Sequence, residues 1–280
     1  MASSCTTSQP PSYAATAEAD RTGDPSSKRR TVADRTSACS GAVTTAASPV
    51  PGRVRSGLVA TGCLQRNDWI CGEYLTTRAD TILDATVSHL ALTAVSVAIG
   101  LVLALPLGVL AFRSPRARSL VLGTSTALYT IPSLAMFSLL LPLTGLTATT
   151  VVVGLVLYSL TILVRNVLAG LLAVPREVVE SATGMGYSPM SLLLKVQLPL
   201  ALPALFAGLR VATVSTVALT TVGAILGNGG LGNLIYSGLR TQFQAEVLTA
   251  TVLVVALAVV ADVLLLGVQR AVTPWQRSAR

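Results

Sequence analysis

Long stretches without any charged residue dominate the chain from about residue 90 onward. Residues 90–112 are uncharged, and a helix of that length spans about 34 Å, enough for the roughly 30 Å hydrocarbon layer of a bilayer. Residues 119–164 are also uncharged, and as one helix they would be about 69 Å long. They must therefore turn back once. The sequence Pro142-Leu143-Thr144-Gly145 predicts the turn, because Pro and Gly break helices.

This pattern predicts an all-α, polytopic membrane protein with about five core helices. The expected spans are residues 90–112, 119–141, 148–171, 200–225 and 246–268. Arginines follow the first and the last span, at Arg113, Arg116 and Arg118 and at Arg270, Arg277 and Arg280. Since an excess of arginine marks the cytoplasmic side, we expect the C-terminus inside the cell and the N-terminus outside. A sixth span is the main alternative.

Composition excludes several other classes of protein. Of the 280 residues, 52% are hydrophobic and 11% are charged, and the mean hydropathy is +0.69. Soluble domains carry about 25% charged residues, so a soluble enzyme, a disordered protein and a disulfide scaffold are excluded. Residues 85–280 hold eleven Lys/Arg and four Asp/Glu. This excess is typical of membrane loops rather than of a basic stripe on a soluble face, so no nucleic-acid partner is expected.

The two ends of the chain differ from the apolar region. Residues 1–66 are rich in Ser, Thr, Ala, Pro and Arg, and this composition predicts a disordered extension. The alternative is that the start of the chain is mis-assigned, so that part of the first 60 residues does not belong to the natural protein. Residues 67–89 predict an amphipathic segment at the membrane surface, because Trp69 and Tyr74 suit the interface. His89 is expected to be an interface residue, and residues 272–280 are expected to form a cytoplasmic tail.

The chain lacks the residues that an energy-converting enzyme needs. It has only two lysines, Lys28 and Lys195, and neither follows the glycine of a phosphate-binding loop. Four cysteines without a CxxC pair and a single histidine do not make a zinc site. No catalytic residue, metal or cofactor is therefore expected. If the protein transports a solute, another subunit must supply the energy.

One cytoplasmic segment, residues 175–199, has a distinctive spacing. It contains Glu180-Ser181-Ala182-Thr183-Gly184-Met185-Gly186, then nine residues, then Val196-Gln197-Leu198-Pro199. Pro175 and the acidic residues suit a helix N-terminus, and the two glycines allow a sharp turn after it. A second short helix is expected to begin at Tyr187 and to end near Pro199. The small residues at positions 181, 182, 184 and 186 have little or no side chain, so another protein can come close to the backbone there.

This segment resembles the EAA loop of binding-protein-dependent ABC importer permeases, with the expected spacing at each position. Ser181 and Val196 replace the usual Ala and Ile. The resemblance implies that the segment couples to an ATPase through Glu180, Ser181, Ala182, Gly184, Gly186, Leu198 and Pro199. An ordinary cytoplasmic loop is the alternative.

Further motifs resemble the osmoprotectant branch of these permeases, which handles glycine betaine, carnitine, choline or proline betaine. They are residues 129–136 (YTIPSLAM), 163–166 (LVRN), 198–203 (LPLALP) and 227–232 (GNGGLG). The resemblance covers about residues 68–268. It implies a type I ABC importer transmembrane domain at 90–271, cytoplasmic ATPase subunits, a second permease copy or a homologous permease, and an extracytoplasmic substrate-binding protein. A methionine-type permease, a standalone carrier or channel, and a membrane scaffold are the alternatives.

Several residues within the spans are candidates for the translocation pathway. They are Tyr129, Thr130, Pro132, Ser133, Tyr158, Asn166 and Arg210. A proline frees backbone carbonyls on which a substrate cation can rest. Packing between helices is the alternative for Tyr129, Thr130, Pro132, Ser133 and Tyr158. Arg165 and Asn166 are also candidate contacts of the coupling segment or the ATPase, with a positive-inside anchor as the alternative. Arg210 and Asp262 are expected either to form an ion pair between two spans or to face separate water-filled crevices.

Overall fold

The computed structural model describes residues 62–277, and within this range the regular structure is entirely helical. The α-helices are α1 (Cys63–Arg66), α2 (Gly72–Thr77), α3 (Ala79–Arg113), α4 (Pro115–Thr130), α5 (Ser133–Thr144), α6 (Ala148–Leu172), α7 (Arg176–Gly184), α8 (Pro189–Leu192), α9 (Leu198–Thr220), α10 (Leu231–Thr241) and α11 (Gln244–Val272). A π-helical turn, η1 (Leu193–Gln197), and two 3-10 segments, η2 (Thr221–Leu226) and η3 (Pro274–Arg277), complete the set. The predictions for residues 1–61 and 278–280 lie outside the described residues.

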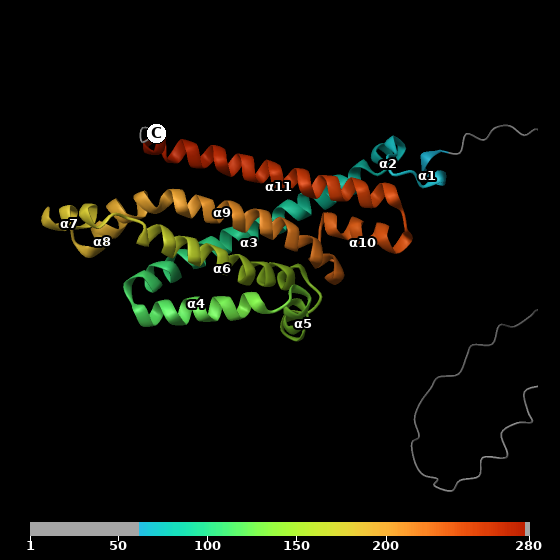
Figure 1. Cartoon of the computed structure of the whole chain (residues 1–280). Helices are drawn as coiled ribbons and strands as arrows, with labels where there is room; N and C mark the ends of the chain where they lie inside the picture. The colour runs from blue at the N-terminus through green and yellow to red at the C-terminus, as the bar shows by residue number, and fades with distance from the viewer. Residues whose placement is uncertain (1–61, 278–280) are drawn as a thin grey trace, which may run out of the picture. The chain divides into compact units, whose positions relative to one another are not determined.

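Helix α6 lies at the centre of the helical body, between α3, α9 and α4 (Figure 1). Its side chains are the most buried of any long helix, and they join α3 and α9 in shared apolar clusters. Glycines make this close packing feasible. A Cβ atom on Gly108 would lie 2.3 Å from the side chain of Val167, and one on Gly154 would lie 2.5 Å from the ring of Phe137. Small residues therefore bring the helices together, as is common in membrane bundles.

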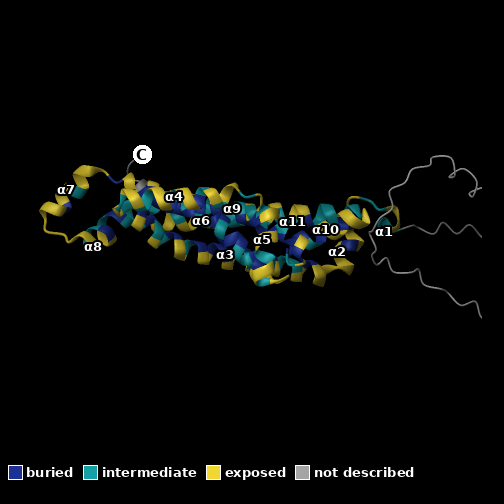
Figure 2. Cartoon of the chain, turned by 90° about the horizontal axis from the view of Figure 1, so that it is seen from below, coloured by how far each residue is buried: buried dark blue, intermediate teal, exposed yellow. Residues whose placement is uncertain are grey.

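The two ends of this body carry different elements. Helices α7 and α8 project from one end, near the last described residues, and α1, α2 and α10 lie at the other (Figure 1). We call these the α7 end and the α10 end. Exposed side chains predominate on α7, whereas buried side chains run through the middle of the body (Figure 2). The body thus has a packed centre and two distinct terminal surfaces.

The first long helix begins earlier than the sequence pattern predicted. Helix α3 starts at Ala79 rather than at residue 90, and residues 62–78 form α1 and α2 instead of one surface helix. Tyr74 is buried beside Phe243, with ring centroids 5.4 Å apart. His89 is completely buried and is not an interface residue. The prediction was wrong because these side chains pack on distant parts of the chain: Tyr74 packs on α10 and α11, and His89 contacts Val217 of α9 and Gly230.

The second expected span is not one helix. Helices α4 and α5 are separated by Ile131 and Pro132 and meet at an angle of 100°. Proline has no N–H to continue the helical ladder and disfavours the helical conformation of the residue before it. The bend therefore occurs at Pro132. The turn predicted at residues 142–145 is present: the chain turns at the last of these residues, Gly145, where φ is +69°, whereas Pro142 lies within α5.

Two other segments are more helical than predicted. The second helix of the coupling segment does not end near Pro199, because α8, η1, α9 and η2 form one run from Pro189 to Leu226. Pro199 has no N–H to donate within this run, and it follows directly after the π-helical turn η1, where the helical hydrogen bonding changes. The segment between the fourth and the fifth expected spans also contains a helix, α10, which packs on α3 and α11.

The structure contains four described helices that are long and apolar enough to cross a membrane, and a fifth crossing if α4 and α5 count as one broken span. These elements correspond to the five expected spans, and the described residues offer no helix for a sixth. Helix α11 is the least buried of them. Its outer face is therefore available to lipid or to another subunit.

Candidate functional site

The turn after α7 is fixed by a hydrogen-bonding pattern that requires glycine at one position. The N–H of Tyr187 donates to the carbonyl of Ala182 (3.3 Å), and the N–H of Gly186 donates to that of Thr183 (3.0 Å). This pair of bonds is the Schellman motif, which needs a left-handed residue. Gly186 supplies it with φ +83°. Gly184 closes α7 in helical conformation, so only one of the two predicted turn glycines has a positive φ.

The α7–α8 segment, residues 175–192, presents side chains outward. Glu180, Ser181, Gly184 and Gly186 are exposed, whereas Ala182 is only 2% exposed and anchors the segment. A Cβ atom at Gly184 would meet no described atom within 4 Å. Packing within the described chain therefore does not require glycine at this position. The missing side chain leaves room for a partner protein.

Three exposed apolar residues at the tip of this segment were missed at the sequence level: Met185, Tyr187 and Met190. Met185 is 71% exposed and Met190 53% exposed. Methionine adapts its shape to a partner surface, so the tip has the character of a docking surface. The sequence did contain a signal for them: large apolar residues stand next to a glycine turn, and such a turn cannot bury them.

Glu180 also borders a crevice of about 300 Å³ between α7 and the body. Gln197 and Phe112 of the body also line this crevice. Leu198 and Pro199 are half-buried in the first turn of α9 and do not reach the tip. The structure therefore separates the predicted coupling residues into an exposed set on α7 and a pair that belongs to the helical body.

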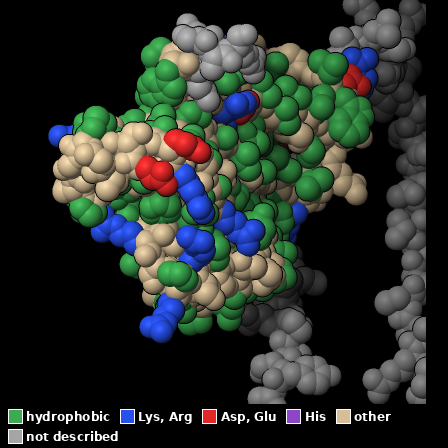
Figure 3. Space-filling view, turned by 60° about the vertical axis from the view of Figure 1, so that its left-hand side comes forward, with side chains coloured by type: hydrophobic (Ala, Val, Ile, Leu, Met, Phe, Trp, Pro, Cys, Tyr) green, Lys and Arg blue, Asp and Glu red, His purple; other side chains and the backbone are tan. Residues whose placement is uncertain are grey.

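Charged side chains gather at the α7 end (Figure 3). The junction of α3 and α4 carries Arg113, Arg116 and Arg118, while α7 carries Glu177 and Glu180. The Arg113 guanidinium contacts the sulfur of Met190 at 3.8 Å. The end of the body that bears the α7–α8 segment is thus strongly polar, in contrast to the apolar flanks.

A second group of predicted residues meets at the break between α4 and α5. The hydroxyl of Tyr158 on α6 donates to the carbonyl of Ile131, and the rings of Tyr129 and Tyr158 lie 5.8 Å apart, edge to face. Tyr129, Thr130 and Pro132 are exposed, and Ser133 is half-buried in the first turn of α5. The freed Ile131 carbonyl is therefore held by a tyrosine, while the neighbouring surface stays open.

Asn166 is not part of either group. It lies between α6 and α9, where a Cβ atom on Gly208 would come within 2.3 Å of its side chain, and its amide donates to the Ile162 carbonyl of its own helix. The adjacent Arg165 donates to the hydroxyl of Thr126 on α4 at 2.7 Å. In the described structure both residues contact neighbouring helices and not the coupling segment.

Arg210 and Asp262 are brought together between α9 and α11. Arg210 Nε donates to Asp262 Oδ1 at 2.8 Å, and Nη2 donates to Oδ2 at 2.7 Å. Both side chains remain about a third exposed. Such two-bond pairing fixes orientation as well as distance, and here it ties the otherwise exposed α11 to the body.

The α10 end is organised around a glycine-rich loop. His89 Nε2 lies 3.1 Å from the carbonyl of Val217, and Thr93 bonds Thr220 at 3.2 Å. Gly230 contacts the backbone of His89 so closely that an added Cβ atom would lie 2.7 Å away. Polar contacts therefore join α3 to the end of α9 at this loop, and the role of His89 had no signal in the sequence pattern.

A disulfide that was also missed closes the small cap formed by α1 and α2. Cys63 and Cys71 are bonded, with Cα atoms 5.5 Å apart. Glu73 lies near the two sulfurs, but the disulfide removes the thiolates that a metal would need. Asn67 fastens the cap to the start of α11, donating to the Gln242 carbonyl and accepting from the Gln244 N–H, each at 2.8 Å.

Beneath this cap, burial raises the pKa of the Tyr74 hydroxyl above its usual value, and the nearby Glu246 raises it further. Tyr74 therefore stays neutral at physiological pH and packs as an apolar ring. The cap is held by a covalent bond, by the Asn67 hydrogen bonds and by aromatic packing.

The sequence of this helical body is similar to the sequences of known membrane proteins. A family model described as a binding-protein-dependent transport system inner membrane component matches residues 87–278. The chain is 32% identical over 202 residues to the choline transport system permease protein OpuBB of Bacillus subtilis (strain 168), which covers 72% of this chain and 93% of that protein. It is 34% identical over 206 residues to the osmoprotectant import permease protein OsmW of Salmonella typhimurium, covering 72% and 96% respectively.

A solved structure shares the fold. The chain is similar to a chain of the MetNI methionine ABC transporter in an inward-facing conformation, with a TM-score of 0.64 and 26% identity over 69% of this chain and 96% of that one. The expected fold class, an all-α type I ABC importer transmembrane domain, is confirmed by this likeness and by the helices described above.

The ion pair yields a test of the packing of α11. We expect Arg210→Ala and Asp262→Ala each to be less stable than the double variant, because each single change leaves one charge without its partner next to apolar side chains. The melting temperatures of the three variants, purified in the same detergent, measure this order. A double variant that melts no higher than the weaker single variant would mean that the two charges stabilise the protein separately.

Proposed function

Because the chain belongs to the family of binding-protein-dependent transport system inner membrane components, we propose that it is the membrane-spanning subunit of an ATP-driven importer for quaternary ammonium osmoprotectants. The relatives OpuBB and OsmW are named for choline and osmoprotectant transport, which supports this solute class. The observation that carries the proposal is the exposed α7–α8 segment, which contains a glycine-dependent turn between its two helices, on a chain without a phosphate-binding loop.

Each subunit of the proposed importer has its own role. Cytoplasmic ATPase subunits receive the α7–α8 segment, a substrate-binding protein outside the membrane delivers the solute, and this chain with a second permease, identical or homologous, forms the pathway. The chain itself is non-catalytic. ATP binding draws the ATPases together, the docked segments move with them, and the helices shift as rigid bodies between inward-facing and outward-facing arrangements. The exposed face around Tyr129, Thr130 and Pro132 is then a candidate wall of the pathway.

We further infer the orientation in a bacterial plasma membrane. The α7 end, with its arginines, lies in the cytoplasm, because positively charged loops are retained there. The α10 end lies outside, where an oxidising compartment supports the Cys63–Cys71 disulfide. The N-terminus is therefore extracytoplasmic and the C-terminus cytoplasmic.

The solute class is tested by uptake. We expect deletion of the gene for this chain to abolish ATP-dependent uptake of radiolabelled choline or glycine betaine, and re-expression of the full chain to restore it. Methionine uptake serves as the comparison, since the methionine transporter shares only the fold at 26% identity. Loss of methionine uptake instead would favour that alternative, and uptake that persists after ATP depletion would favour a carrier or channel.

Coupling is tested at the positive-φ glycine of the Schellman turn. Gly186→Val forces a β-branched residue into the left-handed region at a cost of about 1–2 kcal/mol, which shifts a local equilibrium about tenfold. We expect uptake to fall by about that factor while the amount of protein in the membrane stays unchanged. Glu180→Lys, which reverses a charge on the exposed face of α7, is expected to act in the same direction.

The matched control is Gly145→Val, at the turn between α5 and α6. Gly145 has a similar φ of +69° and, like Gly186, no neighbour within 4 Å of an added Cβ atom. Its ψ of −171° lies in a region that glycine alone populates readily, so the backbone strain of a valine there is at least as large, but it lies away from the α7–α8 segment. Equal losses of uptake in the two glycine variants would indicate general strain and not a specific role in coupling.

Orientation is tested by thiol labelling in intact cells, with Cys5 and Cys39 replaced by serine. A membrane-impermeant maleimide is expected to modify Cys63 and Cys71 only after reduction, because the disulfide protects both sulfurs. The variant Gly184→Cys in a background without the other cysteines is expected to react only after lysis. Labelling of Gly184→Cys in intact cells would reverse the orientation.

A further inference from the structure

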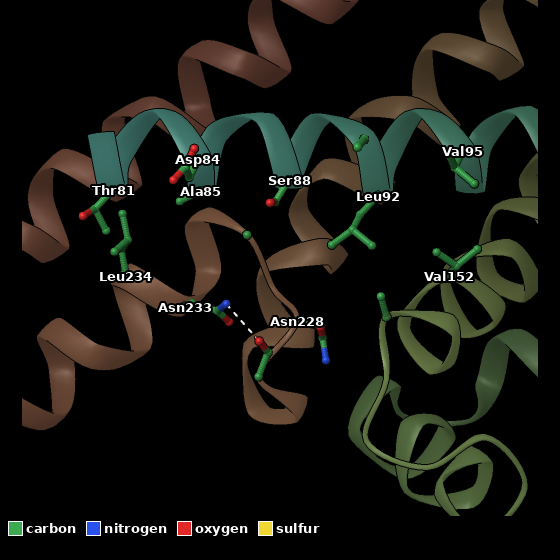
Figure 4. Close-up of a pocket in the computed structure, with 14 residues that line it drawn as sticks. Thr81, Asp84, Ala85, Ser88, Leu92, Val95, Val152, Asn228, Asn233 and Leu234 are labelled. Atoms are coloured by element: carbon green, nitrogen blue, oxygen red, sulfur yellow. Dashed lines mark hydrogen bonds between the residues drawn. The ribbon is translucent and has the colours of Figure 1, made fainter. Parts of the chain in front are cut away.

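A cavity of about 570 Å³ opens at the α10 end (Figure 4). It is bounded by α3, by the loop before α10, by α10 and by the start of α6. Its volume lies within the range of about 300–1,000 Å³ that is typical of small-molecule sites. None of the residues singled out as pathway candidates lines it.

The face of α3 that lines this cavity is polar at one end and apolar at the other. Thr81, Asp84 and Ser88 line its outer part, and Leu92 and Val95 continue the same face further along the helix. Positions three and four residues apart share a helix face, so this order places the polar groups together (Figure 4). Val152 of α6 faces the apolar part. A carboxylate therefore stands at one side of a cavity whose remaining walls are mostly alkyl.

The charges of the lining favour a cation. Asp84 is exposed and has no ion-pair partner among the described residues. The lining includes neither lysine nor arginine, so no group with a positive charge is present to receive a carboxylate.

The two asparagines at the wall are engaged in shaping the loop. Asn233 accepts from the Gly229 N–H at 2.9 Å and donates to the Gly227 carbonyl at 3.1 Å, and Asn228 donates to the Leu226 carbonyl at 3.1 Å. They hold the wall in position, and Asp84 is left as the acidic residue of the lining.

This combination matches the chemistry of a quaternary ammonium group. Such a cation has no N–H to donate, so it is recognised by a negative charge together with contacts to its methyl groups. The lining contains no aromatic residue, and the cavity thus lacks the cation–π cage that produces tight binding. A site with a carboxylate and alkyl walls but no cage holds the cation weakly, which suits a solute that must move on.

Building on the proposed function, we propose that this cavity is a transient subsite for the quaternary ammonium head of the solute and that Asp84 makes the permease favour net-cationic solutes over zwitterionic ones. A choline-like cation gains the full attraction of the Asp84 carboxylate. A betaine carries its own carboxylate, which Asp84 repels and which no basic group in the lining compensates. Asp84 is thus a specificity-determining residue.

Direct binding to the full chain in lipid nanodiscs tests the subsite. Saturation-transfer NMR of the choline methyl signal is expected to show binding to the wild type and to Asp84→Glu, which keeps the charge. For Asp84→Asn the apparent affinity is expected to fall about fivefold, the effect of losing one attraction between unit charges in a water-accessible site. Glycine betaine is expected to bind more weakly and to respond less to this change.

The matched control is Asp80→Asn. Asp80 is an exposed carboxylate one turn earlier on α3 that does not line the cavity. Its loss changes the net charge equally and is expected to leave choline binding unchanged. Equal binding by the wild type and Asp84→Asn, equal weakening by the two asparagine variants, or no binding of choline to the wild type would each overturn the subsite.

Uptake by cells that express these variants separates the subsite from the proposed function. We expect Asp84→Asn to lower the ratio of choline to glycine betaine uptake about fivefold, as the binding difference requires, and Asp80→Asn to leave the ratio unchanged. An unaltered ratio in Asp84→Asn, with uptake intact, would overturn the subsite alone. Asp84-dependent choline binding without any ATP-dependent uptake of these solutes would overturn the proposed function alone.

Discussion

The hydrocarbon layer offers no water to backbone N–H and C=O groups, so each of these groups must find a partner within the protein. This constraint explains why the described structure is helical throughout and why its irregular backbone is confined to a few places. At the sharpest of them, between α4 and α5, the hydroxyl of Tyr158 takes up the carbonyl of Ile131. The bend thus depends on a side chain from a neighbouring helix as much as on Pro132.

The same constraint shapes the end of α9. The helix tightens into the 3-10 segment η2 and ends at Gly227 with φ +75°, and His89 contacts the carbonyl of Val217 within α9. Polar side chains of α3 therefore support the region where the regular ladder changes. Close contacts of Gly230 and Gly232 with neighbouring backbone leave no space for larger residues there. The glycine-rich loop is consequently a packed part of the body and not a free turn.

The number and approximate place of the spans were predictable because uncharged stretches and arginine clusters are properties of the sequence alone. The start of α3, the bend at Pro132 and the helix α10 were not, because each depends on a contact between distant residues. Nothing near Tyr74 in the sequence indicates that Phe243 will cover its ring. The disulfide was missed for a similar reason, since two cysteines eight residues apart have no pairing signal until the cap has folded.

The candidate sites show the same division. The spacing from Glu180 to Pro199 marked the α7–α8 segment, and local geometry accounts for one of its positions, Gly186, whose φ is positive. The meeting of Arg210 and Asp262 was one of two alternatives that the sequence left open, and the structure shows the two side chains paired. The exposed tip at Met185 and the buried position of His89 required three-dimensional packing. The sequence alone marked neither.

The uninterrupted run from Pro189 to Leu226 has a mechanical consequence. At 1.5 Å per residue it is about 57 Å long, and it links the tip on one side of the bilayer to the glycine-rich loop on the other. A stiff rod of this kind transmits a push or a tilt over its whole length without any relay of rearranging side chains. Its π-helical turn at Leu193–Gln197 lies close to the tip, so a displacement at the tip must pass through this change in helical hydrogen bonding before it reaches the rest of the run.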